Sequence, residues 1–190
     1  NIKKIDIIGL DYESNFQLKQ KLDFLKINNL FSINKTEIQN VIKSNKLINS
    51  YSIFKRYPAS LKIEIEKTEF LAYVKKGNDT FFLGSNGKLI DTKETNLELP
   101  IIFGNFEIDN FFELKKIIDN ISFNYKDIKN LFFFNSGRWD IETFSGILIR
   151  LPNERLAESL KLVIKIMEEK NFGTFQEIDL RQRDQLVING

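Results

Sequence analysis

Apolar residues recur with two different periods in the first part of the chain. Residues 2–10 are rich in isoleucine and contain a glycine near their end, which favours a β-strand. Leucine or isoleucine then recurs three or four residues apart after Ser14 and again after Asn34, which predicts two short helices. Each helix start has the spacing of a capping box, Ser14 with Gln17 and Asn34 with Glu37, whose side chains satisfy free N–H groups.

The two predicted helices are followed by a pair of strands. Residues 48–56 form one strand-like run, and a turn around Pro58 leads into residues 61–66, where apolar and charged residues alternate. The order β-α-α-β-β predicts two helices lying on a small sheet. We expect this first domain to occupy residues 1–73 and a second domain to occupy residues 74–190. The boundary follows from the topology, because the sequence has no Pro/Gly-rich hinge there.

The second domain is predicted to consist mainly of short strands. Asn86-Gly87 favours a tight hairpin turn. Two helices are expected to begin at the capping residues Asp109 and Asn153. Between them lie three strand-like runs, separated by Ser-Gly dipeptides that favour hairpins: 128–135, 138–144 and 147–151. The sequence therefore predicts an α+β fold whose second domain is a mostly antiparallel β domain with two helices.

The last segment, residues 176–188, is predicted to form one strand. Two charged or polar residues, Gln182 and Asp184, interrupt its apolar face, and a bulge or tight bend near Arg183 would explain the interruption. A terminal strand often lies at the edge of a sheet, where unpaired N–H and C=O groups can accept a partner strand. The charges at Arg181, Arg183 and Asp184 either protect such an edge or select a partner.

Composition excludes several kinds of chemistry. The chain has 190 residues, 42% of them hydrophobic, which is enough for a core in one or two domains. It contains neither Cys nor His, so disulfides, thiolate nucleophiles, imidazole ligands and His-based triads are excluded. A net charge of +2 gives no electrostatic drive toward nucleic acid. No run approaches the roughly 18 apolar residues of a membrane-spanning helix, and the start at Asn1 suggests a fragment.

Three features allow more than one interpretation. The carboxylates of Glu64 and Glu66 share one side of a predicted strand and are more consistent with a solvated face than with an acid/base or metal pair. Residues 131–134, Leu-Phe-Phe-Phe, form either an exposed binding patch or a strand buried on both faces, and we favour burial. Trp139 is expected in the core, with Arg138 and Asp140 as a surface ion pair.

Several motifs together resemble the FtsQ/DivIB family of bacterial cell-division proteins. The β-α-α-β-β unit resembles a polypeptide-transport-associated (POTRA) domain, and residues 56–65 are similar to the R-x-P-x-x-L-x-I-x-I passage that closes it. Five further segments appear in the family's order, and the Arg-Trp-Asp form of the third resembles the alphaproteobacterial members: 86–90, 99–104, 138–140, 149–152 and 178–181. The resemblance covers nearly the whole chain.

The resemblance implies a non-enzymatic scaffold of the division machinery, without cofactors, metals, nucleic acid or a small-molecule substrate. Such proteins cross the inner membrane once, place a POTRA domain and a β domain in the periplasm at the division septum, and link early and late division proteins. They bind FtsB and FtsL, and FtsB adds a strand to the end of the β domain. The implied partner-binding residues here are Arg138, Asp179, Leu180, Arg181, Gln182 and Arg183.

One departure from the family pattern and two alternatives remain. Gln182 stands where some members have an aromatic residue, so backbone pairing and charge, or residues after Gly190, would contribute more of the affinity. A POTRA-containing component of an outer-membrane assembly or secretion system is the main alternative, although such proteins usually carry several POTRA domains. The other is a carboxylate-dependent hydrolase, which would need a deep pocket with two close carboxylates.

Overall fold

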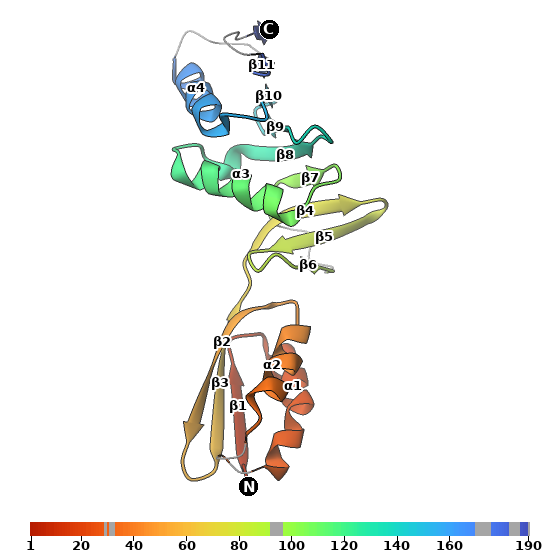
Figure 1. Ribbon diagram of the computed structural model, residues 1–190, viewed down its shortest axis with the longest axis vertical. Helices are drawn as coiled ribbons and strands as arrows, with labels where there is room; N and C mark the ends of the chain where they lie inside the picture. The colour runs from red at the N-terminus through yellow and green to blue at the C-terminus, as the bar shows by residue number, and fades with distance from the viewer. Residues whose placement is uncertain (29, 31–32, 92–96, 170–175, 183–186, 190) are drawn as a thin grey trace. The chain divides into compact units, whose positions relative to one another are not determined.

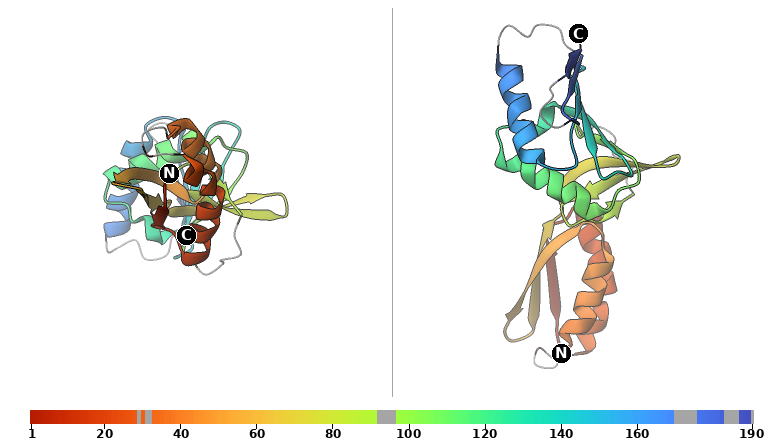
Figure 2. Two further views of the ribbon diagram at one scale, coloured as in Figure 1. Left: turned by 90° about the horizontal axis from the view of Figure 1, so that it is seen from below. Right: turned by 45° about the horizontal axis from the view of Figure 1, so that its top comes forward.

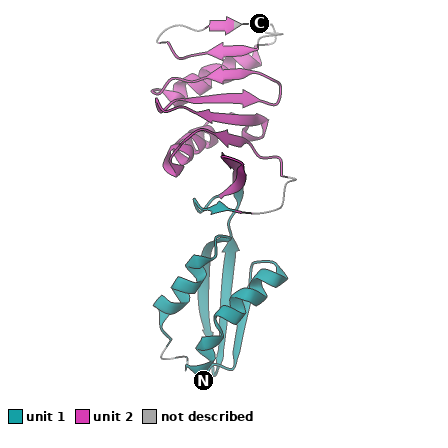
Figure 3. Cartoon of the chain, turned by 90° about the vertical axis from the view of Figure 1, so that its right-hand side faces the viewer, with its two compact units in different colours: residues 1–70, 84–90 teal, residues 71–83, 91–190 magenta. Residues whose placement is uncertain are grey.

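The computed structural model describes residues 1–28, 30, 33–91, 97–169, 176–182 and 187–189. The chain folds into two compact units (Figure 3). Unit 1 comprises Asn1–Phe70 and Gly84–Ile90, and unit 2 comprises Leu71–Leu83 and Asp91–Gly190. Each unit has its own packed interior and is described separately.

Unit 1 has the predicted β-α-α-β-β order. Its elements are β1 (Lys4–Ile8), α1 (Tyr12–Lys21), the short 3₁₀-helix η1 (Asp23–Ile27), α2 (Lys35–Ser44), β2 (Ile48–Arg56) and β3 (Ser60–Lys67). The sheet order is β1-β3-β2, with β1 parallel and β2 antiparallel to the central β3. Both helices lie against one face of this sheet (Figure 1). They cover fully buried residues such as Ile5, Leu61 and Ile63.

The helix starts in unit 1 confirm one predicted cap and correct the other. Asn34 caps α2, since its side-chain oxygen accepts a hydrogen bond from Thr36 N at 3.0 Å. The cap expected at Ser14 is wrong, because α1 begins three residues earlier. Asp11 is the capping residue and accepts from Ser14 N at 2.9 Å. Aspartate and serine are about equally good capping residues, so the spacing in the sequence does not distinguish Asp11 from Ser14.

Most of the remaining elements form one mixed sheet. The strands are β4 (Phe70–Lys76), β5 (Asp79–Gly84), β6 (Leu89–Ile90), β7 (Ile101–Phe103), β8 (Ile128–Phe133), β9 (Trp139–Thr143), β10 (Leu148–Arg150), β11 (Glu177–Asp179) and β12 (Val187–Asn189). Their order is β12-β11-β10-β9-β8-β7-β4-β5-β6. Parallel pairs occur at β4-β7, β7-β8 and β10-β11, while the β8-β9-β10 meander is antiparallel as expected. The α+β fold class is confirmed.

A row of aliphatic residues crosses the centre of this sheet and forms the core of unit 2. The strand registers place five residues side by side, and each is 0% exposed: Ile102, Leu131, Ile141, Ile149 and Ile178. Helices α3 (Ile108–Asn120) and α4 (Leu156–Glu168) lie on this face (Figures 1 and 2). Side chains alternate along a strand, so the neighbouring rows point to the opposite, outer face.

The start of α3 lies two residues before the predicted one. Its capping residue is Glu107, which forms a reciprocal capping box with Asn110; the cap expected at Asp109 is therefore wrong. Asp109 lies in the first turn, where an acidic side chain interacts favourably with the helix dipole. An acidic residue is favoured both as the cap and in the first turn, so the sequence pattern does not show whether Glu107 or Asp109 is the capping residue.

The C-terminal segment is two strands, which corrects the single strand expected for residues 176–188. β11 pairs parallel with β10 on one side and antiparallel with β12 on the other, so among the strands that the structure describes β11 is internal and β12 is the outermost. β11 ends at Asp179, three residues before Gln182, where the sequence pattern is interrupted. The predicted bulge at Arg183 lies outside the described residues.

Candidate partner-binding site

The outermost strand β12 has backbone groups that face away from the sheet. Leu180 N donates to Arg150 O at 2.9 Å, so the backbone groups of alternate residues, Ile178 included, point toward β10. Those of Glu177 and Asp179 then point toward β12, where they face Asn189 and Val187 in the register. By the same alternation, the N–H and C=O of Ile188 point to the open edge.

The outer face beside this edge carries a ladder of charges. The register places Arg150 of β10 between Asp140 of β9 and Asp179 of β11, so the three side chains lie in one row. Arg150 also forms an ion pair with Glu177 of β11. Opposite charges on adjacent strands stabilise a sheet by roughly 0.2–1 kcal/mol per pair. The ladder therefore ties β9, β10 and β11 together directly behind the edge strand.

Asp140 is a buried member of this ladder. Its side chain is only 4% exposed, and its Oδ1 accepts a hydrogen bond from Arg138 Nε at 3.0 Å. The predicted core position of Trp139 is confirmed, but the surface ion pair expected beside it is wrong, because the carboxylate of Asp140 is buried. Burial raises the pKa of Asp140, and the hydrogen bond from Arg138 partly opposes that rise.

Arg181 is held in place by Asp179. Its Nε lies 2.9 Å from each carboxylate oxygen of Asp179, and its backbone N donates to Oδ1 at 3.0 Å. These hydrogen bonds lower the pKa of the Asp179 carboxyl and raise the pKa of the Arg181 guanidinium. Arg181 is thus oriented by Asp179, the last residue of β11, and its side chain remains 39% exposed.

We expect the pKa of Asp179 to lie below the ordinary aspartate value and the pKa of Asp140 to lie above it. Asp179 stabilises the fold above about pH 4, the usual unfolded value, and this contribution is lost as the pH falls through its lowered folded pKa. Asp140, with a raised pKa, binds its proton earlier in the folded state, so stability rises as the pH falls through that value. An NMR titration of the side-chain carboxyl groups shows which of the two aspartates has the lower pKa. Arg181→Gln should return the pKa of Asp179 toward the ordinary value. Asp140 titrating below Asp179 would contradict this assignment.

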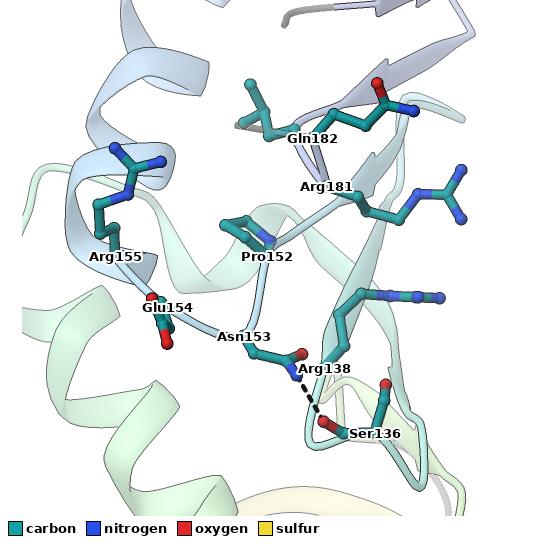
Figure 4. A pocket seen from close by; sticks show the side chains of 9 residues that line it. Ser136, Arg138, Pro152, Asn153, Glu154, Arg155, Arg181 and Gln182 are labelled. Atoms are coloured by element: carbon teal, nitrogen blue, oxygen red, sulfur yellow. Dashed lines mark hydrogen bonds between the residues drawn. The ribbon is translucent and has the colours of Figure 1, made fainter. Parts of the chain in front are cut away.

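A cavity of about 430 Å³ opens next to these arginines. Figure 4 shows Arg138 and Arg181 extending side by side, with Arg155 on the other side of Pro152. Glu154 is the acidic residue that lines it beside the three arginines. Because Arg138 and Arg181 are already hydrogen-bonded to aspartates, the excess positive charge at the rim is modest. The lining favours a carboxylate over a cation.

The predicted cap at Asn153 is wrong, and its side chain has another role. Asn153 Nδ2 donates to Ser136 O at 2.6 Å, which joins the segment before α4 to the β8-β9 turn (Figure 4). The residue before α4 is instead Arg155, with a left-handed backbone at φ 59°. An arginine with positive φ is uncommon. No signal in the sequence pointed to Arg155, because its position depends on how residues 152–155 cross the end of the sheet.

The structure brings most of the predicted site residues together. Arg138, Leu180, Arg181 and Gln182 line the cavity, and Asp179 lies directly behind it. Leu180 is 8% exposed, so it belongs mainly to the core. Arg183 lies outside the described residues. Sequence reasoning missed Arg150 as a site residue, although the segment 149–152 was among the family-like motifs.

The described part of the chain offers neither a membrane-spanning helix nor a metal centre. No helix there is both long and apolar enough to cross a membrane. Within the same residues, no group of three or more His, Cys, Asp or Glu side chains is arranged to hold a metal ion.

Two family models match the chain. The model described as "POTRA domain, FtsQ-type" matches residues 1–67, and the model described as "Cell division protein FtsQ/DivIB, C-terminal" matches residues 72–181. The second match covers more than half of the chain. The POTRA match is of the FtsQ type, which favours a division protein over a secretion component.

Curated relatives agree with both matches. The cell division protein FtsQ of Rickettsia bellii is 26% identical over 172 residues, which is 88% of this chain and 64% of the relative. DivIB of Bacillus cytotoxicus is 26% identical over 121 residues, 64% of this chain and 47% of the relative. The chain thus spans about half to two thirds of their length. The extracytoplasmic domain of DivIB from Geobacillus stearothermophilus aligns with a TM-score of 0.40 at 16% identity, covering 57% of this chain and 99% of that structure. The chain belongs to the FtsQ/DivIB family of cell-division proteins.

Proposed function

We propose that this chain is a non-enzymatic scaffold of the division machinery that binds FtsB, together with FtsL, by strand addition at β12. In this proposal residues 1–73 are the POTRA domain and residues 74–190 carry the partner-binding edge. The protein acts on the periplasmic side of the inner membrane, held there by one membrane-spanning helix, and links early and late division proteins at the septum. The outward-facing backbone of β12, in the same sheet as the strands that carry the arginine-lined cavity, is the observation that supports it best.

The edge offers a partner strand two kinds of contact. The outward N–H and C=O of Ile188 supply main-chain hydrogen bonds, each contributing roughly 0.5–1.5 kcal/mol net. Ile188 is half-buried and lies next to Ile178 at the end of the aliphatic row. An apolar partner side chain at the next position would extend this row and be shielded from water. Strand addition of this kind gives affinity through the backbone and specificity through alternate side chains.

The arginines favour an acidic segment beside that strand. A partner carboxylate near Arg181 would share the guanidinium with Asp179, since Arg carries more donors than one carboxylate uses. Arg138 is anchored at Nε to buried Asp140, and its guanidinium lies 4.2 Å from the centre of the Phe134 ring. It precedes β9, three strands away from β12, so it would contact a part of the partner that continues across the outer face of the sheet. The role of the pair is to select acidic partners, and most of the affinity comes from the edge.

Reversal of the charge at Arg181 tests the proposal. Arg181→Glu places a carboxylate beside Asp179 and is expected to weaken binding of a periplasmic FtsB segment about tenfold, or about 1.4 kcal/mol. Titration calorimetry gives the affinity and circular dichroism the folded fraction. Arg181→Gln separates loss of the positive charge from repulsion.

A matched control is Lys161→Glu on the exposed side of α4, which should leave the affinity unchanged. If Arg181→Glu stays folded and binds the FtsB segment as tightly as the unaltered chain, the proposed role of Arg181 is wrong. If the unaltered chain itself does not bind the segment, the proposed partner is wrong.

A further inference from the structure

Arg150 lies in the middle of the ladder of charges behind the arginine-lined cavity. It is on β10, with Asp140 of β9 on one side and Asp179 of β11 on the other. Asp140 accepts a hydrogen bond from Arg138 Nε at 3.0 Å. Asp179 accepts one from Arg181 Nε at 2.9 Å. Arg150 therefore stands between the two carboxylates that orient the arginines of the cavity.

The side chain of Arg150 is set apart from the cavity. It is not among the described residues that line the cavity, and it forms an ion pair with Glu177. The carbonyl oxygen of Arg150 accepts a hydrogen bond from Leu180 N at 2.9 Å. This backbone bond does not depend on the side chain, so a substitution at Arg150 removes the guanidinium and keeps the strand pairing.

The charges around Arg150 balance only because of its guanidinium. Three carboxylates lie around it on the neighbouring strands: Asp140, Asp179 and Glu177. The two arginines that pair with the aspartates supply two positive charges, and Arg150 supplies the third. With a neutral side chain in its place, the cluster would be net negative and would repel an acidic partner segment.

Arg150 also affects where the guanidinium of Arg181 is held. The hydrogen bond to Asp179 raises the pKa of Arg181 most, and the charges of Asp140 and Glu177 raise it further. Both of these further carboxylates are therefore close enough to attract the guanidinium. Arg150 forms an ion pair with Glu177 and lies next to Asp140 in the register. Its positive charge offsets the attraction of both, so Arg181 stays with Asp179.

We propose that Arg150 is a positioning residue of the partner-binding site, which holds Arg138 and Arg181 in place through the aspartates on either side of it. Its guanidinium keeps both carboxylates ionised and balances their charge. An acidic partner segment then meets two oriented arginines and no surplus of negative charge. This role rests on the proposed function in so far as the partner is the FtsB segment.

Arg150→Met tests the role first without a partner. Removal of the guanidinium should raise the pKa of both Asp140 and Asp179, because each loses a neighbouring positive charge. The measurement is an NMR titration of the side-chain carboxyl groups. The pKa of Glu142, which side chains of β8 hold low, should not change. Arg150→Lys keeps the charge and should bring both aspartates back toward their values in the unaltered chain.

The arginine side chains give a second measurement without a partner. The Nε–H resonances of Arg138 and Arg181 report their hydrogen bonds to the aspartates, and both should shift and exchange faster with water in Arg150→Met. Urea unfolding followed by Trp139 fluorescence shows whether the variant is folded. If it is not, Arg150→Gln and Arg150→Lys provide the same comparison of a neutral with a charged side chain.

Binding of the FtsB segment, measured by titration calorimetry, should weaken about fivefold in Arg150→Met and by less than about twofold in Arg150→Lys. In a chain that already carries Arg138→Gln and Arg181→Gln, Arg150→Met should have no further effect, because the residues that it positions are gone. Lys129→Met is the matched control. It removes a positive charge at the far end of the β8-β9 pair and should leave the affinity unchanged.

Three results overturn the positioning role. The first is that the pKa values of the two aspartates, or the Nε–H resonances, are the same in Arg150→Met and the unaltered chain. The second is equal affinity of these two proteins for the FtsB segment. The third is a fivefold loss that persists in the chain without Arg138 and Arg181, which would mean that Arg150 contacts the partner itself. If the NMR changes occur but the unaltered chain does not bind the segment, the proposed function is wrong and the role of Arg150 in holding the two arginines is retained.

Discussion

Replacing Ile188 by proline is expected to weaken binding of the FtsB segment by up to about a hundredfold, because proline removes the outward N–H and leaves the facing carbonyl of the partner strand buried without a donor, at a cost of about 1–3 kcal/mol. The N–H of Ile188 is the one that the register of β11 and β12 turns to the open side. Proline is tolerated at such edge positions, since no bond inside the sheet is lost. Calorimetry with the FtsB segment gives the change in affinity.

The control for this variant is Ile188→Ala. It removes most of the half-buried side chain but keeps the backbone donor, so its binding should stay within about tenfold of the unaltered chain. The amide resonance of Ile178 reports whether β11 is still in place. Equal affinities for the proline and alanine variants would show that the edge donor is not used, and strand addition at β12 would then be wrong.

Gly104→Ala is expected to cost unit 2 about 3 kcal/mol or more of unfolding free energy. Gly104 follows β7 with φ 104°, and a Cβ atom there would lie 2.1 Å from the carbonyl oxygen of Phe133. Because the colliding atom belongs to the backbone of β8, a rotamer change cannot relieve it. Urea unfolding is followed by the fluorescence of Trp139, the single tryptophan, which is buried in unit 2.

The matched control for the collision is Gly146→Ala. Gly146 also has a positive φ, 89°, but a Cβ atom there meets nothing within 4 Å. Its cost is therefore limited to the backbone strain, about 1 kcal/mol. If both variants lose the same stability, the close approach of Gly104 to Phe133 contributes nothing and the prediction fails.

The sequence predicts the order of elements well wherever a period is maintained over several residues. The alternation of Leu61, Ile63 and Ile65 fixes the central strand of unit 1, and these residues are buried in the structure as expected. Helix starts were predicted less well. Asp11 and Glu107 proved to be the caps in place of Ser14 and Asp109, because several capping residues stand within one turn of each other.

The sequence predicted which residues belong to the candidate site, but it did not predict how their side chains are arranged. Arg138, Arg181 and Gln182 were expected at the partner surface, and they do line one cavity. Their placement came from the resemblance to a family, because no periodicity relates residue 138 to residue 181. The partner of Arg181 was not foreseen, although Asp179 is only two residues away, because side chains two apart share a face only once the strand is known.

By itself the sequence determined the α+β class, the β-α-α-β-β start and the absence of His and Cys chemistry, because these depend on local period and residue type. Tertiary structure alone decided which strand is the edge. The chain turns back after β11, so β12 covers it and the open backbone groups move from residue 180 to Ile188. Tertiary structure also buried Asp140 beside Arg138. Strand neighbours and burial depend on pairings between distant residues, which a pattern along one chain does not contain.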